Sequence, residues 1–325
     1  MAAQKLTEAQ FVSEFQRIGS VDAMAREHGI DRRNIQRRRA SLMEQGHNLA
    51  SRPADGVDSR VPIDYRDTGW TFPREKQIEI DTGAIVISSD HHYWPGEPTV
   101  AHKALLAVIR KVKPRVKIVN GDVFDGVSVC RHPPFGWSDR PSVMDELSAC
   151  QERLGEIEQA LPRGCERLWN IGNHDQRFER TLAMQASEFK GLAGFRLEDH
   201  FHGWDMQWST LINPNAAAPV MVKHRFAGGI HAGYNNAVKS GLTIVTGHTH
   251  LLEAKAIGNY RGRFWGVQTG TLADTDGPQF EYMENAPTHA CSGFAVLTFR
   301  DGKLLPPELC EVHDGVAFFR GEVVA

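Results

Sequence analysis

The sequence has 325 residues, 41% of them apolar, which is enough to bury a core in one large or two smaller domains without disulfide bonds. Its formal charge of -3 excludes a strongly basic protein, so any affinity for nucleic acid must come from a local patch. The five cysteines show no CxxC pair or zinc-finger spacing and are expected to be free thiols. No apolar signal core opens the chain and no apolar run approaches about 18 residues, which predicts a cytoplasmic protein without membrane contact.

Residues 1–46 are predicted to form a small all-helical domain. Apolar residues recur at helical spacing in "TEAQFVSEFQRIG" (7–19), which ends in glycine. A second helix is expected to start after a cap at Ser20, turn at Gly29, and be followed by a third helix capped by Asp31. Two short helices joined by such a turn are typical of a helix-turn-helix, with the second of the two as the DNA-reading helix.

The third helix carries five arginines between residues 32 and 39, which cannot all point in one direction. Some would face a DNA groove and others the flanking phosphates, while Asn and Gln pair with adenine edges. The alternatives are a charged, solvated helix in a small bundle or a dimerisation arm. The residues predicted to contact DNA are Arg32, Arg33, Asn34, Gln36 and Arg37.

Residues 47–75 are rich in Pro, Gly, Asp and Ser and are predicted to be a linker. From residue 76 to 325, short apolar strands alternate with amphipathic helices, which indicates an α/β sheet. The last third reads as strands separated by turns, so the sheet is expected to continue in mixed or antiparallel form.

Each apolar run in this second region ends in side chains that bind metals or move protons. Because the carboxyl ends of parallel strands share one edge of a sheet, these side chains are expected to meet there. A mixture of imidazole and oxygen donors suits one or two divalent ions such as manganese, iron, nickel or zinc better than magnesium or calcium. The strand-end residues are Asp90, His91, His92, Asp122, Asp125, Asn173, His174, Asp175, His224, His248 and His250.

The motifs "DHH", "GDVFD", "GNHD", a strand-terminal histidine and "GHTH", in this order over residues 84–275, resemble those of the calcineurin-like metallophosphoesterases. The resemblance implies a four-layer αββα sandwich with a dinuclear metal site, in which manganese is the favoured metal. The combination with the N-terminal segment resembles proteins of bacteriophages and prophages.

The same resemblance implies a role for each motif residue. His174 would lie beside the substrate phosphate as a proton donor or charge stabiliser, oriented by Asp175. The nucleophile would be a hydroxide made from a water whose pKa both metals lower. One metal would be held by Asp90, His92 and His250, the other by Asn173, His224 and His248, with Asp122 bridging.

Several assignments stay open from the sequence. Either His224 or His231 could supply the fifth-motif ligand; we favour His224, because it ends an apolar run, and expect His231 to contact substrate. Arg131 either contacts phosphate or belongs to a surface loop without a catalytic part. For Asp125 we expect a role in orienting a ligand. Trp204 and Trp208 could stack on a base, although core packing is favoured.

The favoured function is hydrolysis of phosphodiesters in DNA by a nuclease that its N-terminal helices bring to the substrate. An alternative is a phosphatase or phosphodiesterase acting on a small nucleotide or phosphoprotein, with the helices used for assembly. A third hypothesis, a DNA-binding regulator with an inactive domain, is disfavoured because so many polar ligands are costly to keep together. The oligomeric state does not follow from the sequence.

Overall fold

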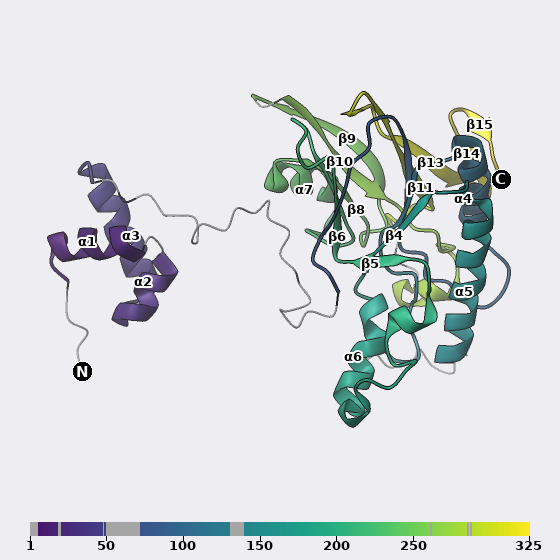
Figure 1. Cartoon of the computed structure of the whole chain (residues 1–325), viewed down its shortest axis with the longest axis horizontal. Helices are drawn as coiled ribbons and strands as arrows, with labels where there is room; N and C mark the ends of the chain where they lie inside the picture. Colours follow the sequence, from purple (N-terminus) through teal and green to yellow (C-terminus); the bar gives the residue numbers. More distant parts are fainter. Residues whose placement is uncertain are drawn as a thin grey trace. The chain divides into compact units, whose positions relative to one another are not determined.

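A computed structural model describes residues 6–18, 21–47, 49, 72–130, 140–260, 262–284, 286 and 288–325. The chain divides into two compact units, residues 1–64 and 65–325 (Figure 1). The expected linker falls largely on residues 50–71, which lie outside the described residues, as do Ser20 and Arg131. No helix in the described ranges has both the length and the apolar character needed to cross a membrane.

The first unit contains three helices, α1 (Glu8–Ile18), α2 (Val21–His28) and α3 (Arg32–Glu44). Asp31 caps α3, accepting the backbone N–H of Arg33 at 2.9 Å, and Gly29 turns the chain with a φ of 61°. The helices bury one apolar cluster, which consists of Phe11, Phe15, Met24, Ile35, Leu42 and Leu49.

Two of the five arginines of α3 contact aromatic side chains of the bundle. The guanidinium of Arg38 lies 4.9 Å from the ring centroid of Phe11, and that of Arg39 lies 5.3 Å from that of Phe15, so both cover the bundle's own core. The residues predicted to contact DNA are all exposed; they are Arg32, Arg33, Asn34, Gln36 and Arg37.

The second unit contains two sheets, whose strands are named in spatial order. The first is β1 (Lys76–Ile78), β6 (Ser209–Ile212), β7 (Val220–Lys223), β8 (Thr243–Thr246), β10 (Gly262–Thr269) and β9 (Leu252–Asn259). The second is β15 (Glu322–Val323), β14 (Val316–Phe319), β13 (Glu308–His313), β11 (Gly293–Arg300), β2 (Gly83–Ser88), β3 (Val116–Val119), β4 (Glu166–Asn170) and β5 (Asp205–Gln207), with β12 (Lys303–Leu304) beside β11.

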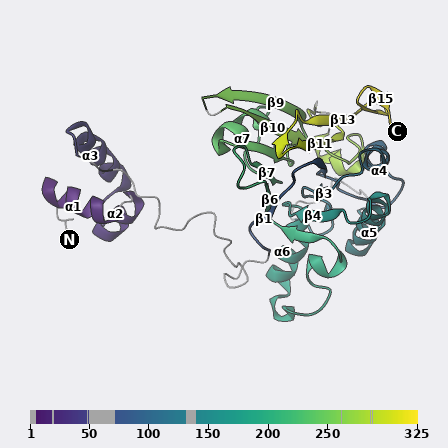
Figure 2. The same cartoon turned by 45° about the horizontal axis from the view of Figure 1, so that its top comes forward.

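Helices cover the outer faces of both sheets (Figures 1 and 2). A core of aliphatic side chains from both sheets, including Ile85, Ile118, Val222 and Val245, lies between them. The larger core packs α4 (Val100–Val112) and α5 (Val143–Ala160) against the second sheet. On the other side α7 (Ala232–Ser240) packs on β8, β9 and β10. The expected four-layer αββα sandwich is therefore confirmed.

The strand directions place the loops that carry the predicted strand-end residues at one edge of the sheets. β2, β3, β4 and β5 are parallel neighbours, as are β7, β8 and β10.

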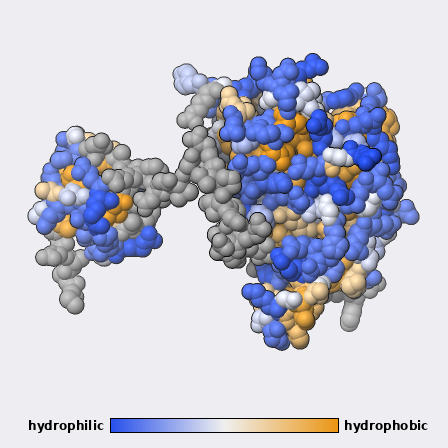
Figure 3. Space-filling view, in the orientation of Figure 1, coloured by the Kyte–Doolittle hydropathy of each residue, from blue (hydrophilic) through white to orange (hydrophobic). Residues whose placement is uncertain are grey.

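Helix α6 (Asp175–Gln185) follows β4, and the short 3-10 helices are η2 (Ser187–Phe189), η3 (Leu197–His200) and η4 (Pro278–Met283). The apolar patch at the far end of α6 and η2 is visible in Figure 3, where Met184, Phe189 and Leu192 are exposed.

Candidate metal centre

The loops that follow β2, β3, β4, β7 and β8 bring the predicted strand-end residues together. Three groups of these strand-end residues have ligand atoms within 4.8 Å of one another, and Asp122 belongs to two of them. The groups are Asp90–His92–His250, Asp122–His224–His248 and His92–Asp122–His174. Side chains more than a hundred positions apart thus form one continuous cluster, with Asp122 at its centre.

The His224 side chain shows that this cluster fits a metal. Its Nδ1 lies 2.7 Å from the carbonyl oxygen of Asn120, which can only accept, so Nδ1 carries the proton. In the neutral ring Nε2 then carries a lone pair and can only accept. It is nevertheless buried and lies 3.0 Å from the Asp122 carboxylate, which is also an acceptor. Two acceptors facing each other require either a proton or a metal ion between them. Their separation suits adjacent ligands that each lie about 2.0–2.2 Å from one ion.

Two further ligand atoms are buried without a hydrogen-bond partner in the described part of the chain. His92 directs Nδ1 at the Asp125 carboxylate, 3.0 Å away, which leaves its Nε2 free. Asn173 Oδ1 is also buried and unpaired. Buried polar atoms are normally satisfied, so the unpaired atoms of His92 and Asn173 are available to coordinate a metal ion.

The other side of the cluster is built around Asp90. Nε2 of His250 lies 3.2 Å from its Oδ1, while Ser89 Oγ and the backbone N–H of His248 donate to the same carboxylate. This carboxylate is completely buried. Its hydrogen bonds fix its orientation and leave Oδ1 facing His250, as expected for a metal ligand supported by neighbouring donors.

The backbone of the ligand loops is strained. Asp90, His92, Asp122, His248 and His250 all have φ between 41° and 69°, in the left-handed region that non-glycine residues seldom adopt. Each such residue costs about 1–3 kcal/mol, and such strain is typical of functional sites. The strain turns the chain sharply after each strand, which aims the side chain at the centre.

Glycines allow these loops to approach each other. A Cβ at Gly172 would lie well inside van der Waals distance of the Asp122 carboxylate, and one at Gly121 would overlap the His224 ring. The glycines that precede Asn173 and Asp122 are therefore needed because the backbone passes directly beside a ligand.

Electrostatics within the cluster also favour cations. Burial alone would raise the pKa of Asp90, but His224 and His250 hold it well below its usual range. Burial would lower the pKa of His224, but the charges of Asp122 and Asp90 raise it to about 10. Without a metal the site thus takes up a proton between His224 and Asp122, which is the position where a divalent ion would compete.

His174 is only partly buried and is oriented by Asp125. The prediction that Asp175 orients it was wrong. Its Nδ1 is 2.8 Å from Asp125 Oδ1. The guanidinium of Arg177, which can only donate, lies 2.9 Å from its Nε2. The ring is therefore neutral, with its proton on Nδ1. Arg177 was missed from the sequence, although it stands three residues after His174 on the same face of a helix.

Asp175 has a different task, which corrects the prediction. As the first residue of α6, its buried carboxylate accepts the backbone N–H groups of Asp122, Val123, Phe124 and Gly172. The indole N–H of Trp169 donates to it as well, at 3.0 Å. Because five donors surround it, this side chain ties the loop after β3 to the loop after β4 and does not contact His174 through a hydrogen bond.

The remaining predicted residues lie outside the cluster. His231 is exposed just before α7, and the buried His91 hydrogen-bonds Ser88 Oγ at 2.9 Å. Trp204 is buried in the larger core, which packs α4 and α5 against the second sheet, and Trp208 is partly buried against the same core. Both agree with the favoured core packing. The structure thus places His224 beside Asp122, while His231 joins no ligand group among the described residues.

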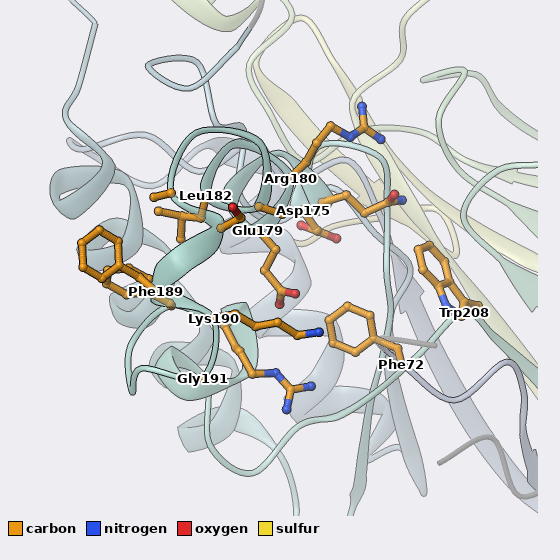
Figure 4. A pocket seen from close by; sticks show the side chains of 15 residues that line it. Phe72, Asp175, Glu179, Arg180, Leu182, Phe189, Lys190, Gly191 and Trp208 are labelled. Atoms are coloured by element: carbon orange, nitrogen blue, oxygen red, sulfur yellow. The ribbon is translucent and has the colours of Figure 1, made fainter. Parts of the chain in front are cut away.

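A cavity of about 740 Å³ lies along α6 (Figure 4). Its lining includes Phe72, Phe189, Lys190 and Trp208, together with Asp175. The carboxylate of Asp175 is already fully engaged by backbone donors. No histidine ligand of the described cluster lines this cavity, so the metal centre is a separate site.

Comparison with known proteins adds little to this geometry. No family model matches the chain, and no curated protein matches it. Among solved structures, a dimetal phosphatase from Danio rerio aligns over 71% of this chain and 96% of its own length, with 8% identity and a TM-score of 0.34. The assignment of the centre therefore rests on the side chains described above. These form a buried His/Asp cluster compatible with two divalent metal ions.

Proposed function

We propose that this protein is a metal-dependent phosphoesterase that hydrolyses phosphodiesters, with DNA as its substrate. The observation that carries the proposal is the lone pair of His224 Nε2 facing the Asp122 carboxylate at 3.0 Å, within a cluster of further unpaired ligand atoms. Such a cluster of imidazole, carboxylate and amide donors suits transition-metal ions, of which we favour manganese over iron, nickel and zinc.

The ligands divide into two sets around Asp122. Two divalent ions held there would activate water as a nucleophile and neutralise the charge on the phosphate. Asp122 reaches both sets, because it shares one group with His92 and another with His224. The proposed sets are Asp90, His92 and His250 for one ion, and Asn173, His224 and His248 for the other.

His174 and Arg177 form the polar wall beside these ligands. His174 Nε2 lies 4.0 Å from Asp122 Oδ2, and Arg177 is partly exposed with its guanidinium on that same nitrogen. A phosphate entering the centre would meet a fixed positive charge here. We propose that Arg177 stabilises charge on the phosphate, while His174 can protonate the leaving oxygen only after Arg177 has left Nε2 and that nitrogen has taken up a proton from water.

Metal content tests the ligand sets directly. The purified chain is loaded with Mn²⁺, and bound metal is counted by mass spectrometry. His250→Gln and His224→Gln should each lose one of two ions, and Asp122→Asn should weaken both. His231→Gln and the exposed His313→Gln serve as controls. Loss of metal in the His231 variant with full occupancy in the His224 variant would reverse the assignment.

Substrate class is tested with small esters and DNA. Mn²⁺-dependent turnover of bis-p-nitrophenyl phosphate should exceed that of p-nitrophenyl phosphate, and DNA should be cleaved. The exposed face of α3 is proposed to bind duplex DNA, so replacing Arg32, Arg33 and Arg37 together by Gln should weaken DNA cleavage but not small-ester turnover. Equal loss on both substrates, or no DNA cleavage by the wild-type chain, would count against a nuclease.

A further inference from the structure

Two exposed aromatic rings of the second unit each have a lysine ammonium close to the ring. Phe226 is 46% exposed and Tyr234 is 44% exposed. The ammonium of Lys223 lies 5.3 Å from the centroid of the Phe226 ring, and that of Lys255 lies 5.6 Å from the centroid of Tyr234. With the exposed Arg225, these five residues are called the aromatic–basic surface. Nothing in the phosphoesterase chemistry above uses them.

The surface is held on a fixed framework. Buried Asn236 of α7 accepts the backbone N–H of Ala227 at 2.9 Å and donates to its carbonyl at 3.2 Å. The same side chain donates to Thr246 Oγ1 of β8. The loop that carries Phe226 is thereby pinned to the helix that carries Tyr234, so the rings need little ordering before they bind a ligand.

This surface adjoins one proposed metal ligand in the sequence. Lys223 and Arg225 flank His224 in the sequence, and His224 faces Asp122. The surface therefore begins, along the chain, on either side of a proposed metal ligand.

The composition points to one class of ligand. Exposed rings offer stacking faces for bases, and cations between them attract phosphates. The neighbouring Glu253 accepts the backbone N–H of Gly233 at 3.1 Å and keeps its negative charge, but Lys223, Arg225 and Lys255 together supply three positive charges. In a duplex the bases are stacked on each other, so only an unpaired strand can place them on Phe226 and Tyr234.

We propose that the aromatic–basic surface binds single-stranded nucleic acid and leads it into the metal centre, an inference that rests on the proposed phosphodiesterase function. Bases stack on Phe226 and Tyr234, and phosphates lie near Lys223, Arg225 and Lys255. The surface therefore defines the substrate as an unpaired DNA strand or an unpaired end of a duplex.

Binding is measured on the full-length chain in EDTA, by fluorescence anisotropy of a labelled oligothymidylate of about 20 nucleotides. Phe226→Ala and Tyr234→Ala should each weaken binding about fivefold or more. Tyr234→Phe, which keeps the ring, should bind as the wild type does. Val238→Ala removes an equally exposed apolar side chain from the same helix and should also have no effect. Thermal unfolding checks that each variant is folded.

Turnover of bis-p-nitrophenyl phosphate is measured in parallel to separate the two proposals. The surface is supported if affinity for the oligonucleotide falls more than small-ester turnover does. It is overturned if both alanine variants bind like the wild type, or if Val238→Ala weakens binding equally, as for a protein-docking face. If the wild-type chain binds the oligonucleotide through its rings but hydrolyses no ester, the surface stands and the proposed function fails.

Discussion

The guanidinium of Arg177 lies 2.9 Å from Nε2 of His174, the nitrogen that would otherwise face an incoming phosphate. The opposite nitrogen of the ring is held by Asp125 at 2.8 Å. The two contacts fix both the orientation and the tautomer of His174. They also place a permanent positive charge at the rim of the metal centre.

Replacing Arg177 by Gln should lower kcat/KM for a phosphodiester by about 100-fold, the effect of removing one donor that stabilises transition-state charge. Metal content should stay unchanged, because Arg177 is not a ligand. Arg180→Gln, which removes the arginine one turn along α6, is the matched control. Similar losses in both variants would show that only the general charge of the helix matters.

Asp175→Asn should destabilise the fold by about 3 kcal/mol, since an amide nitrogen would confront backbone N–H donors that now meet a carboxylate. Because those donors belong to the ligand loops, metal affinity should fall as well. Urea unfolding and metal titration report the two effects. Asp314→Asn, whose side chain is 92% exposed, should change neither. An Asp175→Asn variant with wild-type stability would show that the five hydrogen bonds are dispensable.

Gly172→Ala should abolish most activity, because the added methyl group would displace the Asp122 carboxylate. A displacement of about 1 Å is enough for a loss of about 100-fold. Gly155→Ala provides the contrast: it lies in α5 with no atom within 4 Å of the new methyl group. That substitution should leave activity unchanged and stabilise the helix by up to about 1 kcal/mol. Steady-state kinetics on both variants decide the matter.

His102 should make the fold sensitive to acid. Burial lowers its pKa to about 4, and it is held neutral between Tyr93 and Glu156 at 2.8 Å each. The unfolded chain takes up a proton near pH 6.5, so the stabilisation is present above that pH and lost as the pH falls toward 4. Between pH 7 and pH 5 this amounts to about 2 kcal/mol.

The test compares the wild type with His102→Gln by urea unfolding at pH 7 and pH 5. The variant should be less stable at pH 7, yet should lose about 2 kcal/mol less on acidification. Other groups titrate in both proteins, so the difference between the two slopes is the relevant quantity. Identical slopes would mean that His102 has the same pKa in the folded and in the unfolded chain.

Local sequence patterns were sufficient to predict an α/β sheet and the position of most strand-end side chains, whereas the four-layer sandwich was expected from the family resemblance. Apolar runs closed by Gly-Asp, Gly-Asn-His-Asp and Gly-His-Thr-His report where each strand ends, and parallel strands then bring these ends together. The choice of His224 over His231 followed from the same rule, and the structure places His224 in the cluster.

The sequence did not predict which side chain supports which. Asp175 follows His174 directly, but the start of α6 turns its carboxylate to the loop after β3, far away in the sequence. Asp125 comes from that loop and reaches both His92 and His174. Such pairings depend on how two loops sit against each other, which no local pattern encodes. Arg177 could have been found from its helical spacing alone.

The left-handed backbone of five ligand residues has a consequence for how the protein acquires its metals. Hydrogen bonds among Asp175, the ligand loops and the glycines between them hold this geometry through protein contacts alone. Chelation should therefore yield an inactive protein that is still folded, and Mn²⁺ added back should restore activity without a refolding step. The geometry of the ligands would thus form during folding, and the metal ions would bind afterwards from those that the surroundings supply.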